Sequence, residues 1–174
     1  ADAEVTLEAN PDDLTDGKLA ALRELGLNRL SIGVQSLDDR LLSVLGRRHS
    51  ANEAVQAVRM ATEAGFDNVS IDLMYGLPRQ GLRDWEETLG GAVALEPRHM
   101  SMYCLTLEAG TPMEQWVRVG TMPEPDPDLA AVMDEWAQDR LTSRGYAGYE
   151  ISNWANPGFE SRHNVTYWKN LPYL

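Results

Sequence analysis

Apolar and polar residues alternate in several short segments of this chain, and segments with helical spacing separate them. Because successive side chains of a strand point to opposite faces, the alternation indicates strands. The predicted strands span residues 4–8, 29–35, 68–74 and 100–106. Strands that alternate with helices build a parallel sheet with crossover helices, so the pattern predicts an α/β fold.

Helix boundaries are marked by residues with known capping preferences. Thr15 can cap a helix that ends at Gly26, and Ser50 with Glu53 can form a capping box for a helix that ends at Gly65. Further helices are predicted over residues 36–46, 85–93 and 129–141.

The last part of the chain shows a different pattern. Beyond Thr111 a short helical stretch precedes an acidic, proline-rich connection at residues 123–127. Residues 149–154 and 161–168 are rich in aromatic and β-branched side chains, which favour strands, and Asn156-Pro157-Gly158 is typical of a turn. We therefore predict two further strands joined by this turn.

Each of the first three predicted strands has one apolar and one polar face. The polar faces carry Thr6 and Glu8, Gly33 and Gln35, and Ser70 and Asp72. A parallel sheet covered on both faces would be almost continuously apolar. An antiparallel sheet with one wet face would show the same alternation, but the intervening helices argue against it. The polar faces are therefore predicted to line a wide or open barrel that holds a polar molecule.

Three polar residues are expected at the carboxyl ends of these strands, where such barrels bind their ligands. They are Glu8, Gln35 and Asp72. Each alone could be a helix cap or a solvated loop residue, but three at one structural place favour a binding site. Arg47, Arg48 and His49 follow a predicted helix, where they either pair with its carboxyl end or clamp a carboxylate or a ribose hydroxyl.

The fourth predicted strand repeats the alternation weakly. Tyr103 and Leu105 fall on one face, and Met102, Cys104 and Thr106 fall on the other. We expect Cys104 to be a small residue that faces the lumen.

Charge and cysteine content exclude several classes of function. The formal net charge of −12 would repel a phosphate backbone, so a nucleic-acid partner is not expected. Cys104 is the only cysteine, which leaves neither a disulfide framework nor a thiolate cluster. No apolar run approaches the ~20 residues that span a bilayer, and we expect a cytoplasmic protein. Because the chain opens without Met at a strand pattern and stops without a closing element, we expect a fragment.

Four segments, in this order, resemble radical S-adenosylmethionine proteins of the coproporphyrinogen oxidase group. They are Glu4-Val5-Thr6-Leu7-Glu8-Ala9-Asn10-Pro11, Leu30-Ser31-Ile32-Gly33-Val34-Gln35-Ser36, Leu45-Gly46-Arg47-Arg48-His49 and Ile71-Asp72-Leu73-Met74-Tyr75-Gly76-Leu77-Pro78. The resemblance implies a partial open (β/α)6 barrel. Residues 1–110 would hold the parent's strands from the third onward, and residues 111–174 the remainder of the barrel and the start of a C-terminal region, with a helical and short β extension.

The resemblance also implies which residues bind the cofactor. Contacts to S-adenosylmethionine are carried over to Glu8, Gln35, Arg47, Asp72 and Thr106. The group's CxxxCxxC motif, which holds a 4Fe-4S cluster, is not in this chain, and Cys104 alone cannot replace it. The cluster ligands are therefore expected in a missing N-terminal part, and the chain alone is not expected to cleave the cofactor.

Residues 148–155 and the sequence His163-Asn164-Val165-Thr166-Tyr167-Trp168 resemble the heme chaperone branch of the group, with its HNxxYW motif. This branch implies heme as cargo and recipient hemoproteins, including membrane-bound respiratory ones, and hence also a peripheral membrane location. It implies no oxidase activity. Two alternatives stay open: an oxygen-independent coproporphyrinogen III oxidase, and a radical enzyme of the same fold with an unrelated substrate.

His163 is the first candidate for an axial heme ligand, and Tyr167 is a weaker one. An equally strong alternative is that the motif residues only pack and hydrogen-bond within a strand near the end of the barrel.

Overall fold

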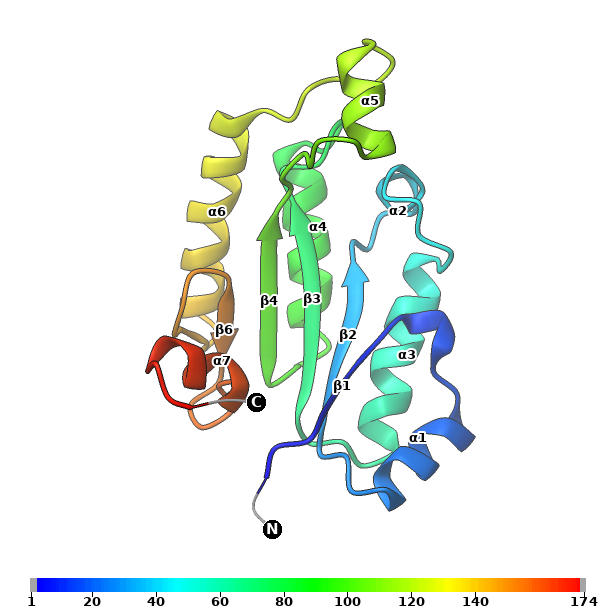
Figure 1. Cartoon of the computed structure of the whole chain (residues 1–174), viewed down its shortest axis with the longest axis vertical. Helices are drawn as coiled ribbons and strands as arrows, with labels where there is room; N and C mark the ends of the chain where they lie inside the picture. The colour runs from blue at the N-terminus through cyan, green and yellow to red at the C-terminus, as the bar shows by residue number, and fades with distance from the viewer. Residues whose placement is uncertain (1–2, 173–174) are drawn as a thin grey trace.

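The structure is a computed structural model that describes residues 3–172, and it contains one six-stranded sheet (Figure 1). The strands are β1 (Thr6–Ala9), β2 (Arg29–Gln35), β3 (Val69–Tyr75), β4 (His99–Cys104), β5 (Ala147–Gly148) and β6 (Asn153–Ala155). Their order is β1-β2-β3-β4-β6-β5, with β1 to β4 parallel and β6 antiparallel to both β4 and β5. The sheet is open at both edges, which confirms the predicted partial barrel.

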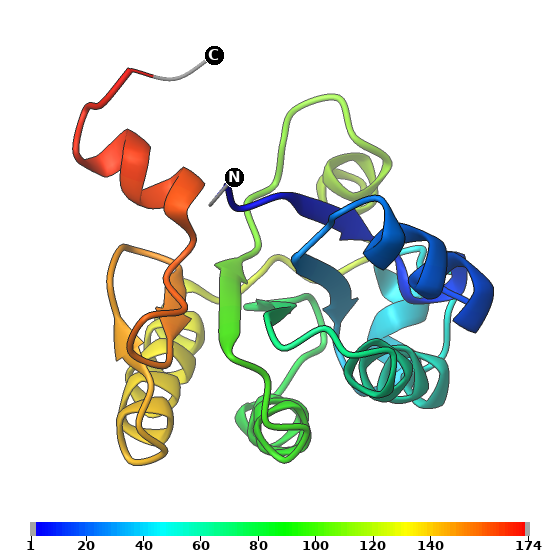
Figure 2. The same ribbon diagram turned by 90° about the horizontal axis from the view of Figure 1, so that it is seen from below.

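Helices connect the parallel strands and cover the outer face of the curved sheet, where Figure 2 shows α3, α4 and α6 along the arc. The helices are η1 (Pro11–Asp13, a 3-10 turn), α1 (Asp16–Glu24), α2 (Asp39–Val44), α3 (Ala51–Glu63), α4 (Leu82–Val93), α5 (Pro112–Arg118), α6 (Pro127–Thr142) and α7 (Arg162–Trp168). In the described part of the chain, no helix is both long and apolar enough to cross a membrane.

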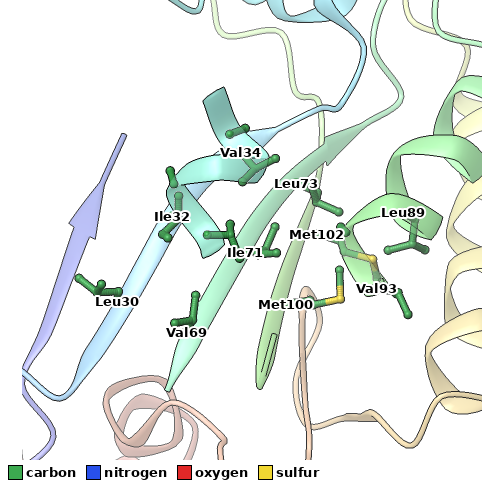
Figure 3. Close-up of a cluster of buried hydrophobic side chains, with 14 of the residues drawn as sticks. Leu30, Ile32, Val34, Val69, Ile71, Leu73, Leu89, Val93, Met100 and Met102 are labelled. Carbon is green, nitrogen blue, oxygen red and sulfur yellow. The ribbon is translucent and has the colours of Figure 1, made fainter. Parts of the chain in front are cut away.

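The core lies between the apolar face of the sheet and these outer helices, as Figure 3 shows. The three central strands contribute Leu30, Ile32, Val34, Val69, Ile71, Leu73, Met100 and Met102, and α4 contributes Leu89 and Val93. Trp85 is fully buried, and its indole N–H donates to the carbonyl oxygen of Met133 at 2.9 Å, which ties α4 to α6. The polar faces of the same strands lie on the concave side of the sheet.

Two predicted helix caps are confirmed. The Thr15 hydroxyl accepts from the Lys18 N–H at the start of α1. Ser50 and Glu53 form the reciprocal bonds of a capping box at the start of α3, with the Ser50 N–H donating to the Glu53 carboxylate at 2.7 Å. These caps satisfy N–H groups that have no partner within the helix.

The strand predicted over residues 161–168 is wrong, because residues 162–168 form the helix α7. The Ser161 hydroxyl accepts from the Asn164 N–H and caps this helix. A local cap of this kind outweighs the weak strand preference of Val165, Thr166 and the aromatic residues.

The strand predicted over residues 149–154 is also largely wrong, since only its last two residues, Asn153 and Trp154, enter β6. The Glu150 carboxylate accepts from the Ser152 N–H at 3.0 Å and from the Asn153 side chain. These local bonds turn the backbone between β5 and β6.

The predicted faces of the fourth strand are reversed. Met100 and Met102 are buried against the helices, while Ser101 and Tyr103 lie on the concave side near Asp72. Cys104 therefore does not face the lumen as expected. Its Sγ atom would be 3.2 Å from a Cβ on Gly76, and the charge of Asp134 on α6 contributes to raising its pKa after the larger effect of burial.

Leu73→Ala should lower the free energy of unfolding by about 2–5 kcal/mol, because it removes fully buried atoms and leaves a cavity between β3 and α4. Leu25, with 77% of its surface exposed, is the matched control, and Leu25→Ala should change stability by less than about 0.5 kcal/mol. Urea unfolding of the full-length protein, followed by circular dichroism, measures both. Equal losses would contradict this placement of the core.

Candidate functional site: two adjoining cavities on the polar face

The concave face of the sheet contains two cavities that share a wall. The first cavity has a volume of about 630 Å³ and lies over the carboxyl ends of β1 and β2. The second cavity, of about 580 Å³, extends from the middle of the sheet to α7. Glu8, Ser31 and Asp72 line both cavities.

Asp72 lies at the centre of this shared wall. It was predicted at the end of its strand, but it is the fourth of seven residues in β3, level with Ser101 of β4. Both of its carboxylate oxygens lie 2.9 Å from the Ser31 hydroxyl, and the Ser70 hydroxyl is 3.4 Å from one of them. Burial raises the pKa of the Asp72 carboxyl, and hydrogen bonds from Ser101 and Ser31 oppose this shift. The carboxylate is thus held in position by serine hydroxyls.

Gln35 closes the upper end of the first cavity. It is the last residue of β2 and has a φ of +66°, where the register between β2 and β3 shifts. Its amide folds back over Gly33. A Cβ added at Gly33 would lie only 2.9 Å from the Gln35 Nε2 atom. The glycine therefore provides the space that the amide occupies.

Arg47 lines the first cavity, whereas its two neighbours have structural roles. The Arg47 guanidinium donates to the Asn10 side-chain oxygen at 3.3 Å. Arg48 forms an ion pair with Asp12 at 2.7 Å, and the buried His49 ring bonds the carbonyl oxygen of Val34 at 3.1 Å. Only the first of the three basic residues therefore reaches this cavity.

Four of the five residues predicted to bind a cofactor meet in the first cavity, namely Glu8, Gln35, Arg47 and Asp72. Thr106 does not line either cavity. It is exposed and follows the end of β4 at Cys104. Ser31 was not among the predicted site residues, although it lies two residues before Gly33 on the same polar face of β2, so the alternation could have identified it.

The second cavity is closed on one side by α7. His163 and Asn164 line it, and the His163 ring packs edge-on against Tyr167 with 4.6 Å between ring centroids. His163 and Tyr167 are both exposed, so they do not pack in the core. The Asn164 side-chain amide lies 3.5 Å from the Tyr149 hydroxyl.

Arg29 fixes the floor of the second cavity. It is buried, and it donates to the side-chain oxygen of Asn68 at 3.2 Å and to the carbonyl oxygen of Phe159 at 3.1 Å. Glu4 lies 3.8 Å from the same guanidinium, and its carboxylate accepts from the Arg162 N–H at 3.0 Å. The start of α7 is thereby held against β1 and β2.

Residues 1–90 match the Radical SAM superfamily. The chain belongs to this superfamily. The coproporphyrinogen III oxidase HemN of Escherichia coli, described as a radical SAM enzyme, superposes with a TM-score of 0.80 over 97% of this chain and 38% of that one, at 26% identity. The archaeal Elp3 of Methanocaldococcus infernus has the same fold, with a TM-score of 0.70 at 21% identity over 78% of this chain and 32% of that one.

Curated relatives within the radical SAM superfamily match the whole chain. The bovine mitochondrial radical S-adenosyl methionine domain-containing protein 1 is 47% identical over 100% of this chain. The heme chaperone HemW is 42% identical in Bacillus subtilis over 99% of this chain, and 39% identical in Escherichia coli over 100%. The chain spans 39% of the length of the bovine relative and 45% of each HemW.

Asp72→Asn should stabilise the protein at neutral pH, because burial disfavours the charged carboxylate of this radical SAM chain. A carboxyl whose pKa is raised by folding contributes stability below its unfolded pKa and loses it as the pH rises through the folded pKa. The advantage of the variant should therefore grow as the pH rises from below 3.8.

Thermal unfolding of both proteins across this pH range measures the difference. Asp67→Asn, at an exposed carboxylate, is the control and should give no such trend. A constant difference between Asp72→Asn and the parent would contradict the burial argument.

Proposed function

We propose that the full-length protein to which this chain belongs is a heme chaperone that binds S-adenosylmethionine in the first cavity and heme beside the second. The observation that carries the proposal is the shared wall at Asp72. This wall joins the first cavity, whose polar side chains can bind a cofactor, to the second cavity, which α7 lines. The similarity to HemW from several bacteria supports this function.

The residues of the first cavity fit S-adenosylmethionine chemically. The ligand has ribose hydroxyls and an amino group that donate hydrogen bonds, a carboxylate that accepts them, and a sulfonium cation. Glu8 and Asp72 can accept, Arg47 can donate to the carboxylate, and the Gln35 amide can do both. Gly33 lets that amide lie close to the sheet. When bound, S-adenosylmethionine supplies the radical chemistry of the superfamily, and these four residues bind and orient it.

The described residues do not fit the 4Fe-4S cluster of the family. Cys104 is the one cysteine of the chain, and a single thiolate cannot hold a cluster. Within residues 3–172 no three potential ligands gather at a metal site. We therefore assign no cluster ligand to this chain.

Helix α7 is the proposed heme contact. Its His163 and Tyr167 side chains are one helical turn apart, exposed and in ring contact, so one face of a porphyrin can approach them from solvent. Their exposure favours a ligand role over simple packing, whereas Asn164 and its contact to Tyr149 fit the structural alternative.

The partners and location that we propose follow from this function. Heme is the cargo, recipient hemoproteins accept it, and membrane-bound respiratory proteins are among the recipients. The protein itself acts in the cytoplasm and associates peripherally with the membrane surface. A coproporphyrinogen III oxidase is the second candidate, favoured by the superposition with HemN over 97% of this chain. It predicts product from coproporphyrinogen under anaerobic, reducing conditions, which the chaperone does not form.

His163→Ala in the full-length protein should shift the Soret band of bound heme and weaken heme binding, because the imidazole is the proposed axial ligand. Tyr167→Phe should have a smaller effect. Lys169→Ala, at the exposed end of the same helix, is the control and should leave the spectrum unchanged. A spectrophotometric heme titration measures all three. Wild-type spectrum and affinity in His163→Ala would refute the ligand assignment.

Asp72→Ala should weaken S-adenosylmethionine binding by about tenfold or more, because one charge-assisted hydrogen bond is lost. Isothermal titration calorimetry of the full-length protein measures the affinity, with Asp67→Ala as the control. Equal affinities of wild type and Asp72→Ala would remove Asp72 from the cofactor site.

A further inference from the structure

A chain of hydrogen-bonded polar groups connects Asp72 to α7. The Ser70 hydroxyl lies 3.4 Å from the Asp72 carboxylate and 2.7 Å from the His99 Nδ1 atom. The His99 Nε2 atom lies 2.7 Å from the Tyr149 hydroxyl, which accepts from the Ser161 N–H at 3.2 Å. Ser70 and His99 are almost completely buried, and His99 also lines the second cavity.

The contacts at each end give this chain a direction. Tyr149 accepts from the Ser161 N–H and from the Asn164 amide, so its own O–H is free to donate to the His99 Nε2 atom. The proton of the neutral imidazole then lies on Nδ1, and this N–H donates to the Ser70 oxygen. The Ser70 O–H in turn donates to the Asp72 carboxylate. Burial lowers the pKa of His99 to about 3, and the charge of Arg29 acts in the same sense, so the ring is neutral over the ordinary pH range.

A ligand that donates to Asp72 would compete with the Ser70 hydroxyl for the carboxylate. Once released, that hydroxyl can rotate and donate to the His99 Nδ1 atom. The imidazole must then carry its proton on Nε2: the Nδ1 proton passes to water, a proton from water adds to Nε2, and the ring stays neutral. His99 lines the second cavity, from which water can reach the ring. Tyr149 would now receive three donors, and a phenol oxygen cannot accept them all. One of the two bonds from α7 is lost.

We propose that Ser70, His99 and Tyr149 are positioning residues that couple ligand binding at Asp72 to the seating of α7, through reversal of this hydrogen-bond chain. The coupling rests on the proposed function, because it makes S-adenosylmethionine the ligand at Asp72 and heme the cargo at α7. The two-state element that such coupling requires is the tautomer of His99. S-adenosylmethionine loosens the start of α7 and thereby favours release of heme.

The first test is ¹⁵N NMR of the histidine rings in the full-length protein with its cluster reconstituted. The His99 signal is assigned by its loss in His99→Asn. Without ligand the proton should lie on Nδ1, and saturating S-adenosylmethionine should move it to Nε2 and shift the backbone amide of Ser161. An unchanged tautomer at saturation would overturn the proposal.

The second test measures heme affinity with and without S-adenosylmethionine. In the wild type the cofactor should weaken heme binding by about fivefold, the effect of one ordinary hydrogen bond. Tyr149→Phe keeps the ring but removes the hydroxyl, and the ratio should fall to one. Tyr146→Phe is the matched control. This buried tyrosine donates to the Pro97 carbonyl oxygen and takes no part in the hydrogen bonds between Asp72 and α7, so the variant should keep the wild-type ratio.

The outcomes separate this proposal from the proposed function. A switch of the His99 tautomer without any heme binding would refute the chaperone function alone. Heme binding with a ratio of one in the wild type, or with the wild-type ratio in Tyr149→Phe, would refute the coupling alone.

Discussion

Asp72 and Leu73 are neighbours in β3, and they point to opposite faces of the sheet. Leu73 is completely buried against the helices, while Asp72 forms the shared wall of the two cavities. The same alternation holds in β2, where Ile32 lies between Ser31 and Gly33. A shift of one residue in register would place the carboxylate in the core and the leucine in the lumen. The burial of one face of these strands therefore determines the position of the binding groups that the same strands carry on the other face.

Much of this arrangement could be predicted from the sequence, because alternation and capping are local signals. The strands β2 and β3, the caps at Thr15 and Ser50 and the open α/β architecture follow from neighbouring residues. Residues 161–168 were assigned wrongly because their composition favours a strand. The Ser161 cap and the contacts around it stabilise a helix instead. In the fourth strand the sequence pattern was weak, and methionine rather than tyrosine occupies the buried face.

The candidate site was predictable only in part. The resemblance to a family identified residues that the fold then brings together in one cavity, whereas periodicity alone could indicate only polar strand ends. The contacts between Ser31 and Asp72, and between His99 and Tyr149, join residues 41 and 50 positions apart. Such contacts depend on the register of strands that are distant in sequence, and no local pattern encodes them. The connection between the two cavities therefore required the structure.

The contacts of Arg29 have a consequence for synthesis of the protein. Its guanidinium joins β2 to the Phe159 carbonyl, 130 residues further along the chain. The walls of the first cavity all come from residues 7 to 72, whereas the second also needs residues 153 to 166. Because chains fold from the N-terminus as they leave the ribosome, the first cavity can form early, and the second cavity can form only after α7 has emerged. A nascent chain would thus present a cofactor pocket well before it could hold cargo.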